Sequence, residues 1–287
     1  MALKQWIPWH AKIAMKVVFS RLPLRYQAWQ RSGLFVHGAM DAPAYALRVV
    51  EAHVSRAGWR DLEGKTVLEL GPGDSVATAV IARAMGAARS WLVDAGPFAN
   101  RDLAVYRAVA ALLAERGMNA PDLSGVDSLE ALLETCRATY LTNGLEGLAA
   151  IPAGSVDLAF SQAVMEHVRL HEVNPTLAEL RRVVAPEGVT THQVDLKDHL
   201  GGALNHLRFS EATWEADWMS QSGFYTNRIR FADYVRRFEA AGFRCEVDDV
   251  RRWPALPTPR ARLAEAFRAL PDDDLRVSQF DIVGRPH

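Results

Sequence analysis

Residues 65–75 read Lys-Thr-Val-Leu-Glu-Leu-Gly-Pro-Gly-Asp-Ser, a short apolar run that leads into a turn with two glycines. The run predicts a buried strand, and the small apolar residues of 76–85 predict a helix that packs on a sheet. Residues 90–94, Ser-Trp-Leu-Val-Asp, predict a second strand. A strand, a helix and a strand within roughly thirty residues form the βαβ unit of a parallel sheet. Such sheets bind ligands outside the carboxyl ends of their strands, so the glycine turn is the first candidate site.

The rest of the chain continues this alternation. Further strands are predicted at 138–142, 155–160, 189–194, 243–250 and 275–283. Helices are predicted at 44–57, 177–184 and 231–241, and one more runs from the fourth strand through Leu170. Alternating strands and helices predict an α/β fold with a mostly parallel sheet covered on both faces. The last two strands are joined without a full helical crossover, which is typical of an antiparallel edge.

Composition excludes several classes of protein. The 287 residues are 49% apolar with a formal net charge of −1, which gives no electrostatic reason to expect nucleic acid as a partner. Cys136 and Cys245 are too few for a disulfide framework and predict free thiols in a reducing cytoplasm. No apolar run reaches the roughly 20 residues that cross a bilayer. Residues 3–20 predict an amphipathic helix that either packs on the domain or makes weak contact with the inner membrane surface.

The residues around the glycine turn favour a cationic ligand. Val76 stands where a dinucleotide fingerprint has its third glycine, and Asp74-Ser75 lacks the lysine of a phosphate-binding loop. The first absence also argues against a nicotinamide dehydrogenase. Glu69 and Asp74 place negative charge where a pyrophosphate would lie, and a sulfonium with an amino group suits that charge better. Asp94, which ends the second strand, can accept hydrogen bonds from two ribose hydroxyls.

At this point the sequence resembles the class I S-adenosylmethionine-dependent methyltransferases of the small-molecule type. The pieces that match, in the family's order, are Val67-Leu-Glu-Leu-Gly-Pro-Gly-Asp-Ser75, Leu92-Val-Asp94, Ser155-Val-Asp-Leu-Ala-Phe-Ser161 with Glu166-His-Val168, and Leu180-Arg-Arg-Val-Val-Ala-Pro-Glu-Gly188. The resemblance implies a Rossmann-like seven-stranded sheet whose last strand is antiparallel. It also implies S-adenosyl-L-methionine as the cofactor and a transferase activity.

The resemblance implies site residues as well. Glu69, Gly71, Pro72 and Gly73 would border the methionine end of the cofactor, and Asp94 would hold its ribose. Asn143 would lie near the adenine, and Ser161 and Gln162 would line the pocket. In domain terms, residues 1–63 are expected to form a helical N-terminal cover. Residues 64–287 are expected to form the methyltransferase domain, with a helical insertion at about 98–137 and an acceptor lid at about 195–230.

Methyl transfer to an alcohol needs a base near the carboxyl ends of the fourth and fifth strands. His167, Asp195 and His199 are the candidates there, and His199 leads because the aspartates beside it can orient a histidine ring. His167 lies in a Glu-His-Val segment that recurs in family members with different acceptors, which favours a structural or cofactor role. For the stretch from His192 to His199, the alternatives are a bound metal or a solvated loop. Ala163 stands where ubiquinone-pathway O-methyltransferases have a metal-binding glutamate, so no metal is predicted.

Aromatic, amide and guanidinium side chains gather in residues 207–230, a mixture that suits sugars and carboxylates. Tyr225, Asn227 and Arg228 are the predicted acceptor contacts. Together with the N-terminal helices, this segment resembles methyltransferases encoded among bacterial cell-surface polysaccharide genes. We therefore expect O-methylation of a small polar acceptor, such as a glycan or a nucleotide sugar. N-methylation of a small amine and non-catalytic cofactor binding are the alternatives.

Overall fold

The computed structural model describes residues 40–287. The predicted amphipathic helix at 3–20 and most of the N-terminal cover at 1–63 lie outside the described residues. The part of the cover that is described contains helix α3 (Pro43–Arg56), whose start is favoured by the proline in its first turn.

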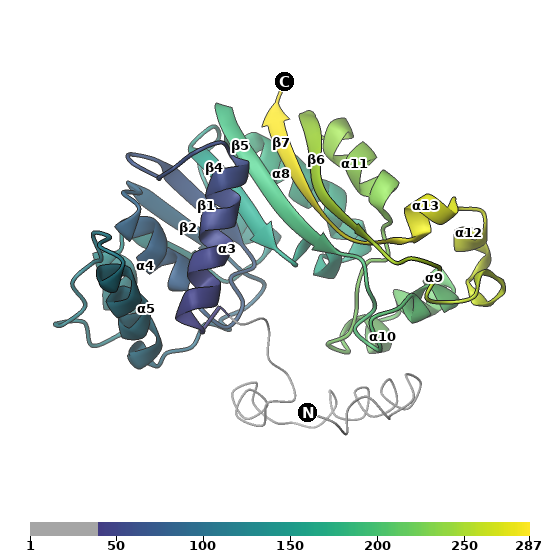
Figure 1. Cartoon of the computed structure of the whole chain (residues 1–287), viewed down its shortest axis with the longest axis horizontal. Coiled ribbons are helices and arrows are strands. Elements are labelled where there is room, and N and C mark those ends of the chain that lie inside the picture. Colours follow the sequence, from purple (N-terminus) through teal and green to yellow (C-terminus); the bar gives the residue numbers. More distant parts are fainter. Residues whose placement is uncertain (1–39) are drawn as a thin grey trace.

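Seven strands form a single sheet in the order β3-β2-β1-β4-β5-β7-β6 (Figure 1). Their bounds are β1 Thr66–Leu70, β2 Arg89–Val93, β3 Ala138–Leu141, β4 Val156–Gln162, β5 Val184–Asp195, β6 Phe243–Arg252 and β7 Val277–Pro286. Strands β1 to β5 pair in parallel, whereas β7 is antiparallel to both β5 and β6. The predicted fold, with its antiparallel last strand, is confirmed.

Helices cover both faces of this sheet. The longer ones besides α3 are α4 Ala77–Ala84, α5 Leu103–Glu115, α6 Leu129–Thr135, α7 Leu145–Ala149, α8 Val173–Val183 and α11 Phe231–Ala240. One apolar core joins α3, α4 and α5 to one face, and a second joins α8 and α11 to the other. Figure 1 shows α3 in front of the sheet and α8 behind it. The carboxyl ends of the parallel strands are thus left as the open edge.

The segment between β2 and β3, expected as a helical insertion, contains α5 and α6. Helix α5 buries Tyr106, Val109 and Leu113 in the first core, so it serves as the crossover that connects two parallel strands. The extra length therefore lies in the loop after α5 and in α6.

The helix predicted to run from β4 through Leu170 is wrong. In its place the structure has two short 3₁₀ turns, η2 (Met165–His167) and η3 (Leu170–Glu172). The amide of Asn227 donates to the carbonyls of Met165 and Val168, and the Tyr234 hydroxyl also donates to Met165. A carbonyl can accept more than one hydrogen bond, so these contacts hold the segment in place without by themselves excluding a helix. The result is an irregular segment held at the sheet edge by contacts from 60 residues further along the chain.

Residues 195–230 form a compact segment with its own small core. It contains η4 (Asn205–Arg208), α9 (Glu211–Trp214) and α10 (Asp217–Ser220). Its core consists of Leu200, Trp214, Met219, Phe224 and Tyr225. The chain then passes into α11, and the link between β6 and β7 holds η5 (Arg260–Arg262), α12 (Glu265–Arg268) and α13 (Asp272–Leu275).

Within residues 40–287, no helix combines the length and the apolar character needed to cross a membrane. Cys136 and Cys245 are both free.

Candidate active site

The glycine turn lies at the carboxyl end of β1, as the sequence predicts. Gly71 and Gly73 have φ values of +73° and +64°, in the left-handed region that favours glycine. A Cβ on Gly71 would lie 2.5 Å from both methyl groups of Val164. The turn therefore touches the segment that follows β4, and a side chain at position 71 would separate the two.

Asp94 follows β2 and faces the same turn. Its carboxylate accepts the backbone N–H of Gly73 and that of Ala95, each at 2.7 Å. Both bonds fix the orientation of the carboxylate at the strand end. A carboxylate has about four acceptor positions, so these two bonds are compatible with further donors such as ribose hydroxyls.

Glu69 gives the turn its most unusual electrostatic feature. The side chain is 1% exposed, and its Oε2 atom has no hydrogen-bond partner among the described residues. Burial raises the pKa of this carboxyl to about 8. Asp74 and Asp94 are also buried here. Near neutral pH the cofactor-free protein therefore holds Glu69 largely protonated, and a positively charged ligand, such as the sulfonium and amine that the resemblance implies, would favour its ionised form.

A pocket of about 690 Å³ opens beside Asp94. Its lining includes Ala95, Asn143 and Gly144, and the Gly144 N–H donates to the Asp94 carbonyl at 2.8 Å. Asn143 is exposed in this pocket, next to the strand end that carries the predicted ribose contact. This is the place where the sequence predicts the adenine.

Ser161 and Gln162 have partners within the protein instead of facing the turn. The Ser161 hydroxyl and His192 Nδ1 share a hydrogen bond of 2.7 Å, and both residues are fully buried. Burial lowers the pKa of His192 to about 3, so it is a neutral core residue and not part of an exposed cluster with His199. Gln162 accepts from His53 Nε2 at 3.1 Å and donates to Gln193.

His53 is a polar residue that the sequence analysis did not single out. It lies on the buried face of α3, where Nδ1 bonds to Thr191 Oγ1 at 2.8 Å. Burial lowers its pKa to about 3, so the ring is neutral. Arg56, one turn further along, forms an ion pair of 2.6 Å with the buried carboxylate of Asp281. Helical spacing from Ala46, Val49 and Val50 could have shown that His53 faces the core.

Two of the predicted bases come together at the open edge. The rings of His167 and His199 are exposed and stack with centroids 4.8 Å apart. The Nδ1 atom of His167 donates to the backbone carbonyl of Tyr225 at 2.9 Å. A carbonyl only accepts, so the lone pair of this ring lies on Nε2.

Glu166 joins this pair, although the sequence analysis gave it no role in catalysis. Ligand atoms of Glu166, His167 and His199 all lie within 4.8 Å of one another. Glu166 is 1% exposed, and both carboxylate oxygens are without a hydrogen-bond partner in the described part of the chain. Burial raises its pKa well above the ordinary value, and the nearby Asp195 adds to this effect. The sequence feature that could have pointed to Glu166 is the presence of an acidic residue within the mostly apolar run Ala163-Val-Met-Glu-His-Val168.

The aspartates near His199 serve other groups. Asp195 forms an ion pair with Lys197 at 3.0 Å and accepts the Lys197 N–H. Asp198 accepts the backbone N–H groups of Leu200, Gly201 and Asn205, which shapes the loop at 198–205. The expected orientation of His199 by a neighbouring aspartate is therefore not seen in these contacts.

The three predicted acceptor contacts are buried. The Tyr225 hydroxyl donates to Glu215 and accepts the Leu170 N–H. Asn227 holds η2, and Arg228 donates to the Phe209 carbonyl while its guanidinium lies over the Trp214 ring. The structure brings these residues to the same edge, but their polar groups bond within the protein.

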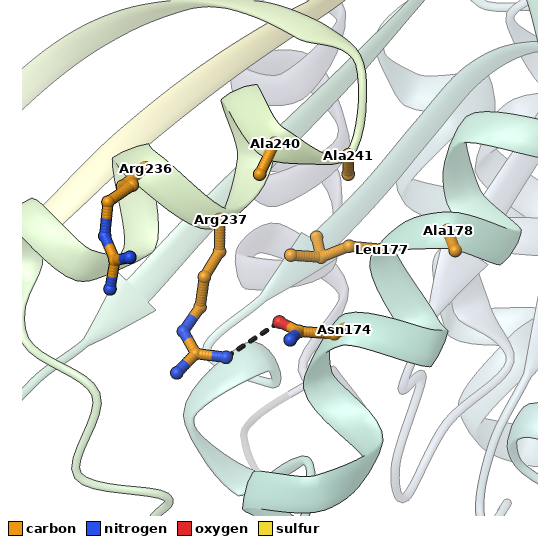
Figure 2. A pocket seen from close by; sticks show the side chains of 7 residues that line it. All are labelled: Asn174, Leu177, Ala178, Arg236, Arg237, Ala240 and Ala241. Atoms are coloured by element: carbon orange, nitrogen blue, oxygen red, sulfur yellow. Dashed lines mark hydrogen bonds between the residues drawn. The ribbon is translucent and has the colours of Figure 1, made fainter.

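A second pocket, of about 360 Å³, lies between α8 and α11 (Figure 2). Arg237 reaches across it and donates to Asn174 at 2.7 Å. None of the predicted site residues lines this pocket.

Comparisons with known proteins find one family model and a set of distantly similar solved structures. Residues 106–191 match the family model described as "Methyltransferase domain". No curated protein matches the chain. Solved structures similar to it include an S-adenosylmethionine-dependent methyltransferase from Mesorhizobium loti, at 17% identity and a TM-score of 0.47, covering 82% of this chain and 97% of that one.

Two further solved structures are similar to this chain. One is phosphoethanolamine N-methyltransferase 2 from Haemonchus contortus in complex with S-adenosyl-L-methionine, which is 16% identical with a TM-score of 0.46. The similarity covers 82% of this chain and 52% of the Haemonchus contortus chain. A methyltransferase from Listeria monocytogenes is 13% identical with a TM-score of 0.46, covering 83% and 97%. Likenesses this distant say nothing about the acceptor.

Proposed function

Because residues 106–191 match a methyltransferase domain and the sheet has the predicted seven strands with an antiparallel last strand, we propose that the chain is a class I S-adenosylmethionine-dependent methyltransferase that methylates a hydroxyl of a small polar molecule at the open edge of the sheet. The observation that supports this site is the contact between Gly71 and Val164. It joins the acidic cofactor turn to the segment that carries His167, so cofactor and acceptor would meet there. A glycan or nucleotide sugar is the acceptor class that we favour.

The cofactor, when bound, supplies an electrophilic methyl group on a sulfonium centre. Glu69, Gly71, Pro72 and Gly73 would border its methionine end, where the acids complement positive charge and the glycines allow close approach. Asp94 would accept the ribose hydroxyls, and Asn143 would line the adenine pocket. Ser161 and Gln162 would contribute through the strand end that they stabilise, because their side chains bond within the protein.

An alcohol must lose its proton as the new bond to carbon forms, and a positioned base accelerates such a step by roughly 10²–10⁴-fold. His199 is our choice for this base, since it is exposed at the edge and stacked on His167. His167, with its lone pair on Nε2, would orient the pair and contact the acceptor. Asp195, the third candidate base, forms an ion pair with Lys197, so we give it no part in removing the proton.

Residues 195–230 would form the acceptor lid. Tyr225, Asn227 and Arg228 would set its shape, because each fixes a different part of the segment against the edge.

The test is methyl transfer by the His199→Ala variant. Labelled S-adenosylmethionine is incubated with glycans and nucleotide sugars, and products are identified by mass spectrometry, which also distinguishes oxygen from nitrogen as the methylated atom. We expect turnover to fall about 100-fold while S-adenosylhomocysteine binds as in the unmodified protein. His171→Ala, which removes another exposed histidine, is the matched control. Unchanged turnover in His199→Ala would remove this residue from the mechanism.

A further inference from the structure

The cluster at the open edge contains the donor set of a metal site. Glu166, His167 and His199 each offer one ligand atom, and these atoms lie within 4.8 Å of one another. Two imidazoles and one carboxylate form the protein ligands of zinc sites that keep a fourth position open. The same set serves other divalent transition metals.

Glu166 is the observation that distinguishes this cluster from a chance grouping of exposed side chains. Its carboxylate is 1% exposed, and no described residue donates a hydrogen bond to either oxygen. A buried carboxyl group whose oxygens have no donor is either held neutral or compensated by a cation. Lys197, the nearby cation, is paired with Asp195 at 3.0 Å.

The surroundings of His167 match what metal ligands require. A ligating histidine usually donates its other ring N–H to a carbonyl or carboxylate, which fixes the ring and its tautomer. His167 does this through Nδ1 to the Tyr225 carbonyl at 2.9 Å, so Nε2 is the atom that can bind a metal. Tyr225 is itself fixed by Glu215 and Leu170.

We propose that Glu166, His167 and His199 bind one divalent transition-metal ion, with zinc the best fit to the ligand set. The third ligand, His199, comes from the loop after β5, so this site does not need the glutamate that the sequence lacks at position 163. Both histidines are exposed, so the open coordination position faces the solvent side of the edge.

The role of this ion rests on the proposed function. A hydroxyl bound to the ion loses its proton far more readily than a free one, and that proton passes to water. The ion then takes over the task that His199 performs in the metal-free protein. Metal binding itself needs neither cofactor nor acceptor, so it is tested separately.

The experiment uses the full chain without an affinity tag, stripped with a chelator and titrated with Co²⁺, whose visible absorption reports the ligands. Zn²⁺ then displaces the Co²⁺, and the metal content is measured. The variants are Glu166→Gln, which keeps the shape of the buried side chain, and His199→Ala, which changes an exposed one. His171→Ala is the matched control, and thermal unfolding checks that every variant is folded.

We expect the unmodified protein and His171→Ala to bind about one ion per chain. Loss of a group that only hydrogen-bonds to a metal ligand already weakens metal binding about 10- to 100-fold, so each ligand variant should lose at least about tenfold in affinity. Uptake of no ion, or equal affinity in all four proteins, overturns the site. If the protein transfers methyl groups but binds no metal, the proposed function holds and the metal site is wrong. If it binds metal but methylates no acceptor, the metal site holds and the proposed function is wrong.

Discussion

Replacement of Glu69 by glutamine should change how the stability of the protein depends on pH. In the folded protein this carboxyl is buried at the end of β1, and its pKa is raised from 4.5 to about 8. In the unfolded chain it is solvated and titrates near 4.5. The folded state thus binds more protons than the unfolded state between these values, so its stability falls as pH rises through that window. Glutamine has a similar shape and stays neutral at every pH.

The size of the effect follows from the two pKa values. Well inside the window the stability changes by about 1.4 kcal/mol per pH unit for one proton. Between about pH 5.5 and 7.5 the unmodified protein should therefore lose roughly 2.5 kcal/mol more than Glu69→Gln. His53 and His192, whose pKa values burial lowers to about 3, change stability in the opposite direction, but equally in both proteins.

Urea unfolding of the cofactor-free proteins at several pH values measures this difference directly. Glu146→Gln, at an exposed position, is the control and should follow the unmodified protein. Parallel curves for Glu69→Gln and the unmodified protein would show that Glu69 is ionised in the fold. The raised pKa, and with it the description of Glu69 as a buried acid that stays neutral near pH 7, would then be wrong.

Two further changes test the cofactor edge. Gly71→Ala should destabilise the protein by about 1–3 kcal/mol more than Gly117→Ala, because both glycines have a φ of +73° but only the first would meet Val164; equal losses in urea unfolding would mean that the contact is unimportant. Asp94→Asn should weaken the binding of S-adenosylhomocysteine by about tenfold in calorimetry. The substitution removes the negative charge and turns the side-chain NH₂ group toward a backbone N–H. The control, Asp102→Asn at the start of α5, should leave binding unchanged.

Local sequence patterns predicted the sheet well. Apolar runs beside glycine turns located β1, β2 and β4, and even the short β3 paired with β2 as expected. The antiparallel edge followed from the missing crossover before β7. These features depend on residues close together in the chain, and the period of a strand or helix is visible there.

The site was less predictable because its geometry depends on distant residues. The amide of Asn227 holds the irregular segment after β4 from a distant part of the chain, and nothing near Met165 in the sequence reveals this contact. Ser161 was expected after the fourth strand but lies within β4, and the alternation of the strand turns its hydroxyl into the core toward His192. His167 and His199 were found as separate candidates, while their proximity to Glu166 required the fold.

The ties between α3 and the sheet have a consequence for protein engineering. His53 bonds to Thr191 and Gln162, and Arg56 neutralises the buried Asp281. A chain shortened to begin at β1 would leave Thr191, Gln162 and the carboxylate of Asp281 without these partners, and it would expose the apolar face of the sheet that α3 covers. The smallest autonomous version of this enzyme therefore includes α3, and fusion partners or circular permutation points belong outside it.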